Sequence, residues 1–93
     1  MAKRNRLEVI RDILKIIQDS HNLIKLTPLL RKSNLSSNRF YQYLEELIQK
    51  RLVVKTEGHI KLTENGKKYL ERYSSIVNFI EEFGLWKISM PGD

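Results

Sequence analysis

The feature that most constrains this chain is a change of hydrophobic period in its middle. In residues 37–50 apolar side chains recur every three or four positions, as Phe40 and Leu44 do, and polar side chains fill the opposite side. This spacing predicts an amphipathic helix. Two short runs follow, at residues 52–55 and 59–62, and both are rich in β-branched and aliphatic residues. A turn that contains a glycine joins them. They predict a hairpin of two short strands.

Two further helices are expected ahead of this unit. The first covers about residues 4–19, and its apolar stripe has the spacing of one helix face, in Leu7, Ile10, Leu14 and Ile17. The second covers about residues 28–33, where Thr27 can cap the helix and Pro28 fits the first helical position, which needs no N–H. A short polar break then leads to Ser36, which we expect to cap the third helix.

A last helix is expected over residues 64–84, capped by Thr63 and ended by Gly84. Its apolar residues step by four, three, four and three positions, which is the seam of a coiled coil. Packing of the helix on its own domain would also explain the beginning of this stripe, but the end should extend past so small a body. We therefore expect this helix to form a dimer interface. Residues 85–93 form a tail to which we assign no function. The expected interface residues are Tyr69, Tyr73, Ile76, Val77, Ile80 and Phe83.

The order helix, helix, turn, helix, hairpin, helix is that of a winged helix-turn-helix. The predicted fold class is therefore mainly α with a small β-hairpin (α+β). Residues 1–63 form the winged helix-turn-helix domain, with the recognition helix at about 37–50 and the wing at about 52–62, and residues 64–84 add an extended C-terminal coiled-coil-type helix. In such domains the second helix of the pair lies in the major groove of DNA, and its N-terminal residues meet base edges.

Positive charge is concentrated in the front half of the chain. The 93 residues carry a net charge of +6, and residues 1–44 account for all of it, with nine Lys or Arg against three Asp or Glu. A one-sided basic surface attracts polyanions, and nucleic acid is the commonest one inside cells. A basic surface that only keeps the protein soluble would show the same excess.

Composition narrows the setting of the chain. No stretch approaches the roughly 20 apolar residues that a membrane span needs. The chain has no cysteine, which excludes a disulfide framework and thiol catalysis. We therefore expect an intracellular protein, cytoplasmic and associated with the nucleoid, without a membrane partner.

The front of the predicted recognition helix carries side chains suited to reading DNA. Arginine can donate two hydrogen bonds to guanine, asparagine and glutamine pair with adenine, and serine or tyrosine can reach a phosphate or a base. Glu45 and Glu46 mark where contact should stop, because phosphates repel carboxylates. Docking by the helix tip is therefore expected, through Ser37, Asn38, Arg39, Tyr41 and Gln42.

Other cations are candidates for contacts with the DNA backbone, which position a protein without specifying sequence. The wing supplies Lys55, His59 and Lys61, the segment before and at the start of the first helix supplies Lys3, Arg4 and Arg6, and the end of the second helix supplies Arg31 and Lys32.

Catalysis receives little support from the sequence. His21 and His59 are isolated, no set of Asp, Glu and His has metal-ligand spacing, and no Gly-rich phosphate loop is present. We expect no enzyme, no metal, no cofactor and no small-molecule ligand. The competing function is a winged helix used for protein–protein contact, favoured by the broad apolar face of the first helix, the acids of the third helix and Trp86 in the tail.

The stretches RLEVIRDILKII, NLSSNRFYQYLEELIQKRLVV and GHIKLTENGKKYLERY together cover most of residues 5–80. They resemble the archaeal 10a-type winged-helix DNA-binding proteins and related small archaeal transcriptional regulators. The pattern LT-x-x-G-x-x-x-L at residues 62–70 occurs in many winged helices and supports the fold. The resemblance implies a homodimer joined by an antiparallel coiled coil of the last helices. It also implies double-stranded DNA as partner, bound by a chromatin-type protein or a regulator. The last helix is shorter here than in that family, which would bring the two winged domains closer or change how they pair.

Overall fold

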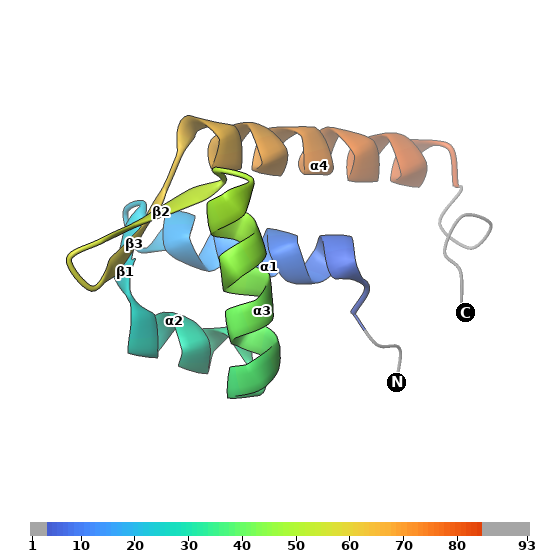
Figure 1. Ribbon diagram of the computed structural model, residues 1–93. Helices are drawn as coiled ribbons and strands as arrows, with labels where there is room; N and C mark the ends of the chain where they lie inside the picture. Colours follow the sequence, from blue (N-terminus) through green and yellow to red (C-terminus); the bar gives the residue numbers. More distant parts are fainter. Residues whose placement is uncertain (1–3, 85–93) are drawn as a thin grey trace.

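The computed structural model describes residues 4–84, which form four helices and a three-stranded antiparallel sheet (Figure 1). This confirms the predicted α+β winged-helix fold. Of the described helices, none combines the length and apolarity that crossing a membrane requires. The elements in chain order are α1 (Arg6–Asp19), β1 (Leu23–Lys25), α2 (Leu26–Ser33), α3 (Ser37–Gln49), β2 (Val53–Thr56), β3 (His59–Leu62) and α4 (Glu64–Glu82).

Side-chain caps explain where three of the helices begin. Asn5 and Glu8 form a capping box on α1, in which the Asn5 side chain accepts a hydrogen bond from the Glu8 N–H at 2.8 Å. Ser36 caps α3 and Thr63 caps α4, where its hydroxyl accepts from the Gly66 N–H at 3.1 Å. These two caps confirm the sequence prediction and fix the start of α3 and of α4.

The segment between α1 and α2 differs from the prediction. The chain leaves α1 and forms β1, whose Ile24 pairs with Ile60 of β3 and is buried. It then enters α2 directly, with Lys25 at the N-cap position and no side-chain cap, so the expected cap at Thr27 was wrong. Pro28 instead takes the third helical position, which also lacks an intrahelical partner for an N–H.

The sheet and helices enclose one core. The strand order is β1-β3-β2, so the hairpin predicted at the wing is joined by a third strand from the front of the chain. Apolar side chains from α1, α2, α3 and the sheet meet inside, and Leu14, Ile17, Leu29, Phe40, Leu47, Val53 and Ile60 are fully buried. Leu7 was expected in the buried stripe of α1 but is 55% exposed, because it lies in the first turn, beyond the part of α1 that the core covers.

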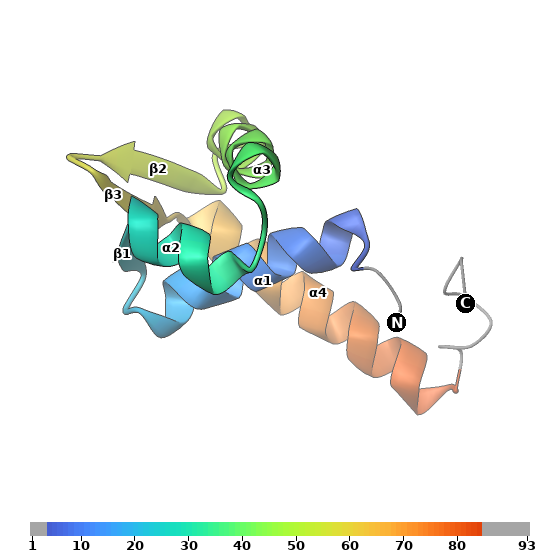
Figure 2. The ribbon, with the colours of Figure 1, turned by 90° about the horizontal axis from the view of Figure 1, so that it is seen from below.

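Helix α4 belongs to the body only at its beginning. Gly66 and Leu70 are its buried residues. A side chain at position 66 would overlap the backbone carbonyl oxygen of Leu52, which explains the glycine at this close approach. From there α4 crosses α1, and its C-terminal half runs beyond the other elements (Figure 2). Gly84 follows the helix with a positive φ of 66°, as expected of a glycine at a helix end.

Candidate nucleic-acid interface

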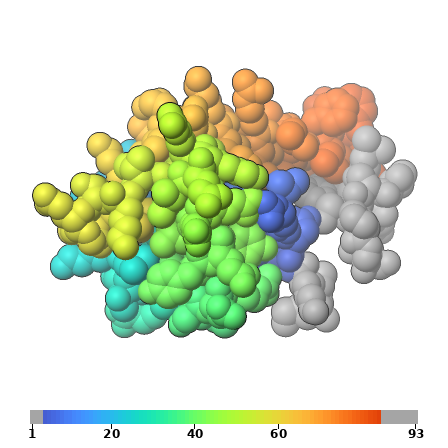
Figure 3. Space-filling view, viewed as in Figure 1, coloured from blue at the N-terminus to red at the C-terminus, as the bar shows by residue number. Residues whose placement is uncertain are grey.

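Helix α3 has one apolar, buried side and one polar, exposed side. Phe40, Leu44 and Leu47 anchor it in the core, while the front residues are exposed. Figure 3 shows α3 and the wing together on one face of the molecule. The exposed set contains all five residues that the sequence predicted for DNA reading, Ser37, Asn38, Arg39, Tyr41 and Gln42. The helix N-terminus adds free N–H groups and a partial positive charge on the same side, which favours a phosphate.

Tyr41 is held in place by the core. Its ring packs edge-on against Phe40, with the ring centroids 5.5 Å apart and the planes at 72°. The Tyr41 side chain nevertheless remains 47% exposed. An exposed aromatic ring on α3 is suited to contact a sugar, a phosphate or a thymine methyl group.

Arg6 comes from another helix but lies beside the front of α3. Arg6, Arg39, Gln42, Tyr43 and Glu46 line one shallow depression in the surface. Two arginines and an amide therefore converge at the surface of α3. The sequence did not predict this meeting, because Arg6 and Arg39 are 33 positions apart and on different elements.

The predicted cations at the N-terminus already have acidic neighbours. The Arg4 guanidinium forms an ion pair with Asp12 at 2.8 Å and donates to the backbone carbonyl of Ser33 at 3.1 Å. It thereby ties α1 to the end of α2, next to the helix-turn-helix turn. Arg6 pairs with Glu46 of α3. Lys3 lies outside the described residues.

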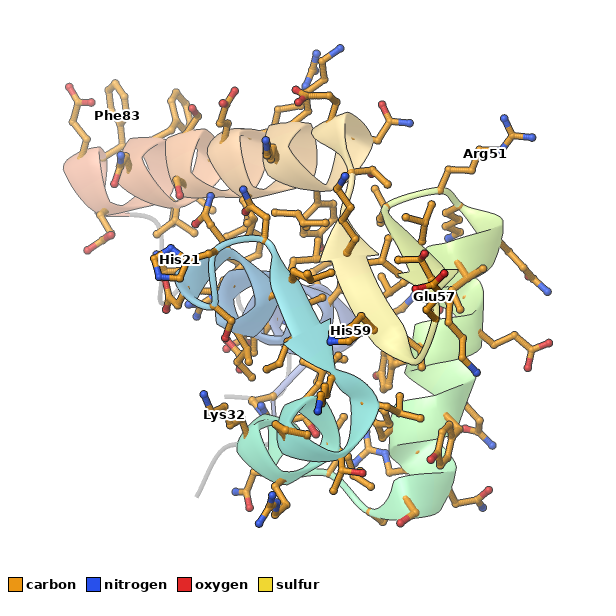
Figure 4. The ribbon with its side chains drawn as sticks, turned by 90° about the vertical axis from the view of Figure 1, so that its left-hand side faces the viewer. His21, Lys32, Arg51, Glu57, His59 and Phe83 are labelled. Carbon is orange, nitrogen blue, oxygen red and sulfur yellow. The ribbon has the colours of Figure 1, made fainter. Side chains whose placement is uncertain are left out.

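Arg31 and Lys32 occupy the last turn of α2 and are exposed. Figure 4 shows Lys32 pointing away from the body. Cations in this position also stabilise the helix, because they face the negative end of its dipole. The helix ends at Asn34, which takes the left-handed conformation with φ 59°.

The wing does not present its basic residues on a single side. Cross-strand pairing places Lys55 opposite the buried Ile60, whereas His59 and Lys61 lie on the other face of the sheet. Strand β1 adds Lys25, which pairs with His59, to that outer face. Strand β1 has only three residues, too few to show an alternating pattern, so it could not be predicted from the sequence.

The tip of the wing is a tight turn, as predicted from its glycine. Glu57 and Gly58 both have positive φ, 47° and 80°. A two-residue turn that joins the strands of a hairpin commonly requires positive φ at both of its residues. Glu57 places a carboxylate at the tip, and its backbone carbonyl oxygen lies 3.3 Å from Nδ1 of His59. The tip therefore lacks the uniform positive charge of a minor-groove arm.

The first two residues of the predicted dimer stripe lie against α1. The Tyr69 hydroxyl donates to the backbone carbonyl of Leu7 at 3.1 Å, and the Arg11 guanidinium lies 5.6 Å from the centre of the Tyr73 ring. Burial raises the pKa of both tyrosines, with a further contribution to the Tyr69 pKa from Tyr73 and to the Tyr73 pKa from Glu8. These rings are part of the domain surface where α4 crosses α1.

The rest of the stripe leaves the body. Ile76 and Phe83 are 59% and 60% exposed, and Val77 and Ile80 are half-buried. Phe79, which the sequence analysis left out, is 56% exposed, and its ring centroid lies 4.9 Å from that of Phe83. Phe83 points away from the other helices at the end of α4 (Figure 4). The distal α4 surface is defined here as Ile76, Phe79, Ile80 and Phe83.

Acidic and histidine side chains do not gather into a metal site in the part of the chain that is described, since no three of them lie together. His21 stands at the turn after α1 and His59 in the wing, at separate places in Figure 4. Residues 4–84 therefore offer no obvious centre for metal chemistry.

Comparison with known proteins adds a family to this description. Residues 3–81 match the family described as winged helix-turn-helix. Over 79 residues the chain is 34% identical to Uncharacterized protein MJ0287 of Methanocaldococcus jannaschii. The matched region covers 85% of this chain and 76% of that protein. It is 28% identical over 79 residues to Uncharacterized protein MJ0290 of the same organism, again covering 85% of this chain, but it spans only 36% of that protein's length. These similarities do not single out the 10a-type group, which stays a prediction. The fold and the match over most of its length show that the chain belongs to the winged helix-turn-helix family.

Proposed function

We propose that this protein binds double-stranded DNA through the front of α3 and the wing, as a transcriptional regulator or a nucleoid-associated protein. The observation that carries the proposal is the separation of polar and apolar side chains on α3. Its polar first two turns are exposed, and its apolar side is buried. A helix built in this way can enter a major groove without disturbing the core.

Charge supports the same function. The net charge of +6 originates in residues 1–44, which include α1, α2 and the front of α3. Arg39 and Gln42 share their depression with Arg6 and are the most convergent donors on this face. Glu45, which is exposed farther along α3, limits the contact to the helix tip.

The two forms of the function differ in how they use the α3 side chains. A regulator should lose affinity for its own site when Asn38, Arg39 or Gln42 is changed, because these residue types read base edges. A nucleoid-associated protein should lose affinity for all sequences equally when lysines or arginines are removed.

We further propose that the protein acts as a homodimer joined by α4. The distal α4 surface supports this, since Ile76, Phe79 and Phe83 are exposed and Ile80 is half-buried beside them, at the end of a helix that projects from the body. An apolar patch of this kind commonly marks an interaction site. Antiparallel pairing of two copies through this surface is the arrangement that the resembled family implies.

Protein–protein contact without DNA is the second candidate. The same apolar surface favours it, because Ile76, Phe79 and Phe83 would fit the apolar side of an unrelated partner as well as a second copy. Salt separates the two functions. A DNA complex with several phosphate contacts weakens steeply as salt rises, whereas apolar contact between proteins changes little.

Fluorescence anisotropy on labelled duplexes tests the proposal. One duplex has mixed sequence and the other carries the region upstream of the chain's own coding sequence, each at several salt concentrations. DNA binding predicts an affinity that falls with salt, with a log–log slope of about −0.9 for each neutralised phosphate. Absence of binding at low salt to either duplex would refute the DNA function and favour protein contact.

A further inference from the structure

Glu46 is a carboxylate held between two cations on the recognition helix. It pairs with Arg6 of α1, and its Oε2 atom lies 2.8 Å from Nζ of Lys50, one turn farther along α3. Its side chain is 19% exposed, compared with 57% for Arg6 and 59% for Lys50. The acid therefore lies below the two cations, which extend outwards from it.

The neighbouring acid provides a contrast within the same helix turn. Glu45 is exposed and forms no ion pair with any residue from 4 to 84. Both acids follow the reading residues of α3, and the sequence alone treats them alike. Only Glu46 faces the depression that also contains Arg39 and Gln42.

A phosphate that approached this depression would find Arg6 already paired. Binding DNA through Arg6 would require its guanidinium to exchange the Glu46 carboxylate for a phosphate, or to share itself between two anions that repel each other. Such an exchange gains little free energy, because one anion replaces another. The remaining carboxylate would also stand close to the DNA backbone, compensated only by Lys50.

We propose that Glu46 is an internal competitor for the DNA phosphate at Arg6, which restrains sequence-independent binding. This inference depends on the DNA-binding function proposed above. Phosphate contacts supply nearly all of non-specific binding. Base contacts by Asn38, Arg39 and Gln42 do not involve Glu46 directly. Restraint on one phosphate contact therefore lowers the affinity for every DNA sequence and leaves the discrimination between sequences unchanged.

The size of the effect follows from counterion release. One additional phosphate contact steepens the log–log salt slope by about 0.9. If that contact contributes nothing at about 1 M salt, it tightens binding about eight-fold at 0.1 M salt. Removal of the Glu46 charge should produce this gain, and the gain should depend on Arg6.

The test measures Kd of the full chain for a mixed-sequence duplex by anisotropy, from low to high salt. The proteins compared are wild type, Glu46→Gln, Glu45→Gln, Arg6→Gln and the double variant Glu46→Gln with Arg6→Gln. Glutamine keeps the shape of each acid, so Glu45→Gln removes the same charge from the same helix without releasing an arginine. Circular dichroism checks that each variant is folded. We expect Glu46→Gln to tighten binding about eight-fold at 0.1 M salt and Glu45→Gln to tighten it much less. Arg6→Gln should change Kd little in the wild-type background and weaken it about eight-fold in the Glu46→Gln background.

Two results would overturn the inference while leaving DNA binding intact. One is equal Kd values for Glu46→Gln and Glu45→Gln, which would reduce Glu46 to a general charge. The other is weaker binding by Glu46→Gln, which would mean that the carboxylate positions Arg6 for the phosphate. No binding by wild type or any variant at low salt would instead refute the proposed function, and the inference with it.

Discussion

Replacing Gly66 by alanine is a sharp test of how α4 is attached to the body. Gly66 lies in the first turn of α4, at the close approach to the turn between α3 and β2. A methyl group there would overlap the Leu52 carbonyl oxygen and lie 2.5 Å from Cδ1 of Leu62. The leucine side chain can turn away, but the backbone carbonyl can move only together with the α3–β2 connection.

Two effects of opposite sign act on the stability of this variant. Alanine is favoured over glycine inside a helix by about 1 kcal/mol. Overpacking a tight contact costs about 1–3 kcal/mol, and we expect the upper part of that range because a backbone atom is overlapped. The clash should therefore win, and Gly66→Ala should lower the free energy of unfolding by about 1–2 kcal/mol.

Urea unfolding at one fixed protein concentration measures this difference, with Ser75→Ala as the matched control. Ser75 is exposed in the middle of the same helix, so alanine there changes helix propensity without any close contact. The control should be as stable as wild type or slightly more stable. If Gly66→Ala proved at least as stable as its control, the close approach of α4 to Leu52 would be refuted as the reason for this glycine.

Three further predictions concern assembly, reading and pH. Changing Ile76 and Ile80 to Asp should convert a dimer into monomers by light scattering, whereas Asn78→Asp, on the opposite side of α4, should not; an unchanged mass would remove α4 from the interface. Arg39→Ala should weaken binding to a selected DNA site by about 1–3 kcal/mol and binding to mixed-sequence DNA by much less, measured by anisotropy, while equal losses would assign Arg39 to phosphate. Because burial raises the Tyr73 pKa, the folded state favours the neutral phenol. Its contribution to stability is present below about pH 10 and is lost as the pH rises further, so Tyr73→Phe should gain stability relative to wild type above about pH 10 in urea unfolding. Parallel curves for the two proteins would contradict this.

The fold followed from local patterns wherever a pattern was long enough to recognise. The 13 residues of α3 and the 19 of α4 each contain several helical repeats, and Ser36 and Thr63 are caps by residue type alone. Strand β1 has three residues, and its partner β3 lies far along the chain. Nothing local distinguishes such a strand from a turn, because its stability comes from tertiary pairing and from burial of Ile24.

The candidate site shows the same division between local and tertiary information. Residue types and helix position predicted the exposed front of α3, since a helix with one buried side must expose the other. The pairing of Arg6 with Glu46 needed the crossing of α1 and α3, which no spacing within either helix reveals. Exposure of Leu7 and Phe79 likewise depends on where α4 leaves α1, so the periodic stripe placed the first inside and omitted the second.

The first turns of α1 connect the reading surface to the α4 attachment. Arg6 contacts Glu46 on α3, and the carbonyl of the next residue, Leu7, accepts the hydrogen bond from Tyr69 on α4. Asn5 caps this turn and fixes its backbone. A shift of α4 that moved Tyr69 would therefore move Leu7. Because Arg6 is the residue before Leu7, its ion pair with Glu46 would be disturbed as well.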